Sequence, residues 1–189
     1  MIIHKLAENQ NWAKAAPILG IASAILLFVF THSSQPIFWA LVNIPLYFFH
    51  QTEEHLWPGG FKRYVNTVVN KLPEGEEKLT DIKVFWINIL LVWVAFLIFG
   101  ALSFKDIRFG LLLIVFSIIN CLTHVGMALR KKEWNPGLVM ASLQLLLSCY
   151  GAYFLTAHGG IHSIALWWII AIVFSAAAHA AVFKFSMTT

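Results

Sequence analysis

Residues 36–60 read PIFWALVNIPLYFFHQTEEHLWPGG, an apolar run that ends in two imidazoles and two adjacent carboxylates before a Trp-Pro-Gly-Gly stop. A long apolar run favours a membrane-crossing helix, and the Pro-Gly-Gly signal ends it. At helical spacing His50, Glu53 and Glu54 share one face. Because ionisable groups buried unpaired in such a helix are costly, they indicate a functional site. We interpret HQTEEH, residues 50–55, as the core of a metal site.

The composition is that of a membrane protein. Hydrophobic residues make up 59% of the 189 residues and charged residues only 12%, about half the usual share of roughly 25%. The mean hydropathy is +0.75. These values exclude an ordinary soluble globular domain. We predict an all-α, polytopic transmembrane helical bundle that forms a single integral membrane domain over residues 1–189.

Turn signals and charges divide the chain into six apolar runs, each close to the roughly 20 residues that a membrane crossing requires. The longest polar segment is a loop at 57–81, which is long enough to fold over the site. The predicted spans are about 17–31, 36–56, 82–104, 107–129, 138–157 and 163–183.

The distribution of basic residues predicts the orientation. With six spans, both termini lie on one side, and of the 13 Lys and Arg residues only Lys105 and Arg108 fall on the other. The positive-inside rule therefore predicts that both termini are cytoplasmic. The net charge of +4 is a topology signal rather than a nucleic-acid surface, so we expect no nucleic-acid partner. Cys121 and Cys149 lie in apolar runs and imply no disulfide framework.

Several polar residues lie at a similar depth in different spans. At a rise of about 1.5 Å per residue, His50 lies about 10 Å and His124 about 9 Å from the cytoplasmic end of its span. His179 and Asn88 each lie about 7.5 Å from the same face. Four spans thus place ligand-capable side chains in one layer near the cytoplasmic side.

This layer contains the usual donors for zinc, iron or manganese. The predicted metal ligands are His50, Glu53, Glu54, His124 and His179. The predicted catalytic residues are Glu53, Glu54 and Asn120. Residues expected to support the ligands by hydrogen bonds are Asn88, His55 and Gln144. A proton relay or a charge-neutralised hydrogen-bond cluster would use the same residues, so both remain alternatives.

The pattern His50-x-x-Glu53-Glu54, followed by Pro58-Gly59-Gly60-Phe61, Asn88, Asn120-x-x-x-His124 and Asn135-Pro136-Gly137, resembles the HXXEE-domain family. These are small multi-span membrane proteins of mostly prokaryotic origin. The resemblance implies a membrane-embedded metal-binding or enzymatic protein, here in a bacterial inner membrane. It covers His50, Glu53, Glu54, Asn120 and His124, whereas His179 is predicted from depth alone.

We expect a metal-dependent hydrolase that acts on a lipid or another small hydrophobic substrate within the bilayer. A bound zinc ion lowers the pKa of its water from about 15.7 to near 7. The carboxylate of Glu53 or Glu54 that is not a ligand would be the general base, and Asn120 would orient a ligand or polarise a carbonyl. Alternatives are a non-haem iron oxygenase or desaturase, including a di-iron form, and a proton- or cation-binding transporter.

Overall fold

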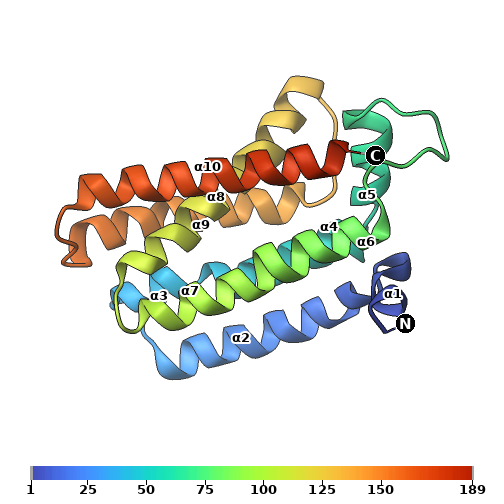
Figure 1. Cartoon of the computed structure of the whole chain (residues 1–189). Helices are drawn as coiled ribbons and strands as arrows, with labels where there is room; N and C mark the ends of the chain where they lie inside the picture. Colours follow the sequence, from blue (N-terminus) through green and yellow to red (C-terminus); the bar gives the residue numbers. More distant parts are fainter. Residues whose placement is uncertain (1, 189) are drawn as a thin grey trace.

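The computed structural model describes residues 2–188, and within that range the regular structure is entirely helical, as the sequence predicts. Figure 1 shows long helices lying roughly along one direction. The elements are α1 (Ile2–Ala7), η1 (Glu8–Ala15), α2 (Ala16–Phe30), α3 (Pro36–Leu41), α4 (Asn43–His55), α5 (Phe61–Tyr64), η2 (Val65–Val69), α6 (Asp81–Trp86), η3 (Ile87–Val94), α7 (Ala95–Ser103), α8 (Arg108–Lys131), α9 (Leu138–His158) and α10 (Ile164–Met187).

Among residues 2–188, five helical stretches are long and apolar enough to cross a membrane, where the sequence predicts six spans. This finding is consistent with an integral membrane protein. The five are Ile2–Phe30, Asp81–Ser103, Arg108–Lys131, Leu138–His158 and Ile164–Met187.

The second predicted span, 36–56, is not among these five, because it forms two consecutive helices, α3 and α4, instead of one. The break falls at Val42, one residue after Leu41. Pro45 explains it, because proline has no N–H to donate to the carbonyl of Leu41, four residues earlier, and its ring crowds that carbonyl. The second of these helices also ends in the polar sequence HQTEEH, which lowers its hydropathy.

The helices connect at two ends of the bundle (Figure 1). Both chain termini lie at the end that also holds α1, α5 and the start of α6. The turns between α2 and α3, between α7 and α8, and between α9 and α10 lie at the opposite end. The chain therefore runs back and forth along the bundle, with α3 and α4 together making one of the passes.

Helix α8 is the central element. It packs along α9 and α10, and also contacts α3, α4 and α7. Its residues Leu111, Leu113 and Ile114 are almost completely inaccessible to solvent. An aromatic cluster of Tyr47, Phe96 and Phe116 joins α4 and α7 to α8. This packing fixes α4 and α8, the two helices that carry the site.

The N-terminal segment folds back against the bundle. Trp12 in η1 is only 4% exposed, and its ring centroid lies 5.0 Å from that of His55 and 5.6 Å from that of Trp93. The backbone N–H of Asn9 donates to Asp81 at 3.2 Å. This segment therefore covers the side of α4 that carries His55.

The segment between α4 and α6, predicted as a polar loop, contains the short helices α5 and η2. Lys62 in α5 forms ion pairs with Glu77 at 2.8 Å and with Asp81 at 3.0 Å. Burial lowers the pKa of Lys62, but the hydrogen bonds and charges of these carboxylates outweigh burial and raise it overall. Asn66 also accepts from the N–H of Leu79 at 2.9 Å. The two short helices of this segment thus pack against residues 77–81 at its end.

Candidate metal centre

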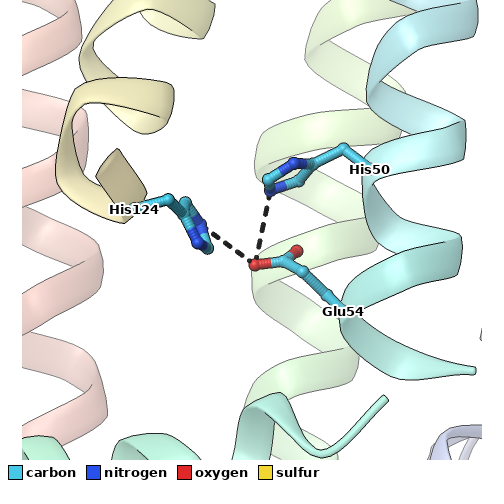
Figure 2. Close-up of side chains that lie close together, drawn as sticks. All are labelled: His50, Glu54 and His124. Atoms are coloured by element: carbon cyan, nitrogen blue, oxygen red, sulfur yellow. Dashed lines mark ion pairs between the residues drawn. The ribbon is translucent and has the colours of Figure 1, made fainter. Parts of the chain in front are cut away.

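Two helices bring two imidazoles to one carboxylate (Figure 2). His50 and Glu54 are one turn apart on α4, so both face α8, which supplies His124. Oε1 of Glu54 lies 3.5 Å from Nε2 of His50 and 3.2 Å from Nε2 of His124. All three side chains are buried, and one ligand atom from each lies within 4.8 Å of the others. This group has a composition that can hold a metal ion.

Asn135 determines which nitrogen of His124 carries the proton. The Nδ2 of Asn135 donates to the backbone carbonyl of His124 at 2.9 Å, so its Oδ1 faces Nδ1 of the same residue, also at 2.9 Å. Because an amide oxygen only accepts, Nδ1 of His124 must be the donor. In the neutral ring the lone pair of Nε2 then points at the carboxylate of Glu54. A hydrogen bond of this kind, from the remaining ring nitrogen, is typical of a metal-ligating histidine.

The other imidazole also reaches this point. Nε2 of His50 lies 3.3 Å from the amide nitrogen of Asn120, one turn before His124 on α8, and 3.5 Å from Oε1 of Glu54. A ring nitrogen carries either one proton or one lone pair in the ring plane. With a proton, Nε2 of His50 would donate toward Glu54; with a lone pair, it could accept from Asn120 or bind a cation. The geometry therefore suits a proton or a metal ion at the centre of the group.

The backbone of Gly137 closes the site on the side of α9. Its φ is +91°, and a Cβ placed there would lie 2.8 Å from Cγ of Glu54, 2.9 Å from Cε1 of His50 and 3.1 Å from Cε1 of His124. Only glycine fits, because it tolerates the positive φ and leaves room for all three side chains. The turn 135–137 thus provides both a hydrogen-bond partner and a wall for the site.

Glu53, predicted as a ligand or a base, is engaged elsewhere. Its Oε1 accepts the N–H of Val139 at 3.0 Å, and its Oε2 accepts the N–H of Met140 at 2.6 Å. Both amides belong to the first turn of α9, whose N–H groups have no partner within the helix. A carboxylate there is favourable also because of the helix dipole. The structure therefore places Glu53 as the anchor of α9 on α4.

His55 is buried next to the group rather than in it. Its Nε2 lies 3.6 Å from Oε2 of Glu54, the oxygen that faces away from His50 and His124. Both ring nitrogens lack a hydrogen-bond partner among the described residues. The ring packs edge-on against Trp12 and Phe61.

Asn88 and Gln144, expected to support the ligands, belong to other hydrogen-bond groups. Asn88 accepts from Gln51 at 2.7 Å, and Gln51 in turn accepts from the indole of Trp93. The amide of Gln144 donates to Asn43 at 3.1 Å, deeper along α4. Both groups join α4 to its neighbours and do not contact the three-residue group.

His179 lies across a cavity from the site. Its Nδ1 is 2.7 Å from the carbonyl of Ser175, so Nδ1 carries the proton and Nε2, which has no partner among residues 2–188, is left as an acceptor. The cavity has a volume of about 440 Å³ and a predominantly apolar surface. Glu54, Asn120, His124, Asn88 and His179 all line it, together with Phe61 and Tyr64 of the segment that was predicted to reach the site.

Sequence reasoning did not predict the contacts of Gln51, which joins α4 to η3, or of Asn135 and Gly137, which contact the site. Gln51 lies inside the motif, and a carboxamide in an apolar helix is itself a signal of a buried polar contact. Asn135 and Gly137 were interpreted as a turn after the fourth span. Their link to His124 depends on how the chain returns after α8, which the local pattern does not encode.

Comparison with known proteins identifies the family of this chain. Residues 41–152 match the model of a family described as proteins of unknown function with an HXXEE motif. No curated protein and no solved structure matches the chain. The matched region contains His50, Glu54, His124 and the turn 135–137, and it makes up more than half of the sequence. The chain therefore belongs to the HXXEE family.

Proposed function

We propose that this protein is a membrane-embedded metal-dependent enzyme, and that it hydrolyses a lipid or another membrane-dissolved substrate. The observation that carries the proposal is the convergence of possible ligand atoms from His50, Glu54 and His124 beside a mostly apolar cavity. Polar groups that converge at the edge of a large, mostly apolar pocket are typical of an active or binding site. Two imidazoles and one carboxylate are the ligand set of several catalytic zinc sites.

The residues around the site have separate proposed roles in metal binding, proton transfer and the orientation of a ligand. A divalent ion held by His50, Glu54 and His124 would supply Lewis acidity and an activated water. Since Glu53 is bound to α9, the proposed proton acceptor is His179, a residue of the cavity lining whose buried Nε2 has no hydrogen-bond partner among the described residues. This nitrogen would take the proton of the attacking water and return it to the leaving oxygen or nitrogen. Asn120 holds the ring of His50 in place.

A second candidate is a non-haem iron oxygenase or desaturase. The same observation favours it, because two histidines and one carboxylate also form the facial ligand set of iron oxygenases. An apolar cavity suits a hydrocarbon substrate equally well. A visible or near-ultraviolet absorption band in the purified protein would identify iron and favour this reaction over hydrolysis.

We also propose that the chain crosses a bacterial inner membrane six times, with both termini in the cytoplasm. Three observations support this arrangement: five helices suit a membrane crossing, α3 and α4 make a further pass, and both ends of the chain lie at one end of the bundle. The basic residues gather at that same end, as expected for the cytoplasmic side.

Elemental analysis of the purified protein in detergent tests the metal site. We expect close to one zinc, iron or manganese ion per chain, and loss of that ion in Glu54→Gln and His124→Asn. His158→Asn, at the opposite end of the bundle, is the matched control and should keep its metal. Protein that binds none of these ions, even when incubated with each of them, would refute the proposal and leave a proton as the shared cation.

A further inference from the structure

Two of the walls of the cavity beside the metal centre barely touch each other. One wall comes from α6 and η3 and includes Ile87 and Leu91; the other comes from α10 and includes Ala180 and Phe183. Helix α10 packs along α8, and no comparable packing joins it to α6 or η3 within the described chain. The cavity therefore lies where two neighbouring helices are separated.

Contacts between α10 and the continuous stretch of α6, η3 and α7 occur beyond both ends of the cavity. At the deeper end, the rings of Phe99 in α7 and Phe174 in α10 lie edge to face with centroids 5.5 Å apart. At the other end, the ammonium of Lys83 lies 5.5 Å from the ring centroid of Phe185 and donates to the carbonyl of Thr188. Between these contacts the walls leave a window between α10 and η3, which we call the lateral window.

The lateral window faces the surroundings of the bundle, which are lipid for a chain of this composition. Phe183, at the edge of the cavity, is 58% exposed. An opening there would let a molecule dissolved in the bilayer reach Glu54 and His124 without passing through water. Asn88 of η3 and Ser186 of α10 are polar residues of the cavity lining, but the surface of the cavity is mostly apolar, which disfavours a charged, water-soluble substrate.

The volume and the polarity of the cavity restrict the substrate further. About 440 Å³ lies at the lower end of the range of roughly 300–1,000 Å³ for pockets that hold drug-sized ligands. This space suits one hydrocarbon chain with a polar end better than a whole two-chain lipid. The polar groups Glu54, His124 and Asn120 come from α4 and α8, so the reacting group would lie against those helices and the chain along η3 and α10.

We propose that the substrate is a single-chain amphiphile, such as a monoacyl ester or amide, and that it enters sideways through the lateral window between η3 and α10. This inference rests on the proposed metal-dependent enzyme, because it places the ester or amide bond at Glu54 and His124. The apolar walls bind the hydrocarbon chain, and the metal centre selects the polar linkage.

Photolabelling tests the inference. The probe is a long-chain monoacylglycerol with a diazirine in the middle of its acyl chain, added to the purified protein in detergent. Saturable labelling of peptides from η3 and from the second half of α10 is expected. Ala180→Phe fills the cavity and should reduce labelling by about tenfold or more, as expected for an overfilled space. Ala181→Phe is the matched control, because Ala181 is exposed on the same helix but does not line the cavity.

Metal content, measured on the same samples, separates the two proposals. Retained metal with labelling that is insensitive to Ala180→Phe, or labelling outside the cavity, would overturn the single-chain substrate and leave the metal centre intact. Equal labelling by a two-chain phosphatidylcholine carrying the same diazirine would also overturn it. Saturable cavity labelling of a protein that binds no metal would instead refute the proposed enzyme and retain the cavity as a lipid-binding site.

Discussion

The hydrogen bonds of His124 to Asn135 determine how the imidazole of His124 is oriented in the site. The side chain of Asn135 contacts both the backbone carbonyl and Nδ1 of His124, so neither the amide nor the imidazole can be reversed without losing a bond. Such an arrangement leaves Nε2 facing Glu54. The same contact thus orients the imidazole ring and sets the atom that is available to bind a cation.

Gly137→Ala should abolish metal binding. A methyl group at this position would lie within 3.1 Å of all three side chains of the site, so Glu54 and the imidazoles must move apart. The positive φ adds strain of about 1–3 kcal/mol. Elemental analysis and thermal unfolding in detergent would measure both effects.

Gly75→Ala is the matched control for this change. Gly75 has the same φ of +91°, but a Cβ there would meet no atom within 4 Å. It should lose similar stability and keep its metal. Equal metal content in the two variants would show that the turn 135–137 does not shape the site.

At the scale of helices, the sequence predicts most of α4 and less of its surroundings. The spacing of His50 and Glu54 correctly places both on one face, since i and i+4 residues of a helix are neighbours. Glu53 lies on the adjacent part of that face, and its partners are amides at the start of α9. Helical spacing gives the direction of a side chain but not the helix end that it meets, so this anchoring role could not be predicted.

Replacing Glu53 should affect stability more than metal binding. Glu53→Ala removes two hydrogen bonds to a charged acceptor and leaves two amides of α9 unpaired, a loss of about 2–5 kcal/mol. Glu53→Gln keeps one amide oxygen as an acceptor and should lose less. Thermal unfolding in detergent would rank the two variants.

Metal content distinguishes this anchoring role from ligation. Glu53→Gln should retain the ion, whereas the neighbouring Glu54→Gln should lose it. If Glu53→Gln lost its metal as completely as Glu54→Gln, then Glu53 would be a ligand, as the sequence alone predicts, and its bonds to α9 would be secondary.

At the scale of the whole molecule, depth along the spans was a useful but incomplete guide. It predicts that His50, Asn120 and His124 meet, and these residues do lie together. It also selects His179 and Asn88, which line the same cavity without joining the group. Gln144 lies apart from the group, because depth says nothing about rotation around the helix axis, and its side chain contacts Asn43. The direction in which a side chain must point to reach the site depends on which helices become neighbours, whereas its depth does not.

The proposed six-span topology can be tested at the ends of α3 and α4, where the structure differs most from a single continuous span. Ser34 and Gly75 are exposed and flank this pair of helices. Single cysteines at these positions, in a background with Cys121→Ala and Cys149→Ser, would be labelled with a membrane-impermeant maleimide on intact spheroplasts and again after lysis.

Ser34→Cys should react in intact spheroplasts, together with Gly160→Cys as the control for the outer face. Gly75→Cys should react only after lysis, because the loop 57–81 contains four Lys and Arg residues, and such residues favour the cytoplasmic side whatever the nearby acidic residues. Labelling of Ser34→Cys and Gly75→Cys from one side would mean that Pro45 turns α3 and α4 back within the membrane, and the metal centre would then lie in a re-entrant segment rather than in a span.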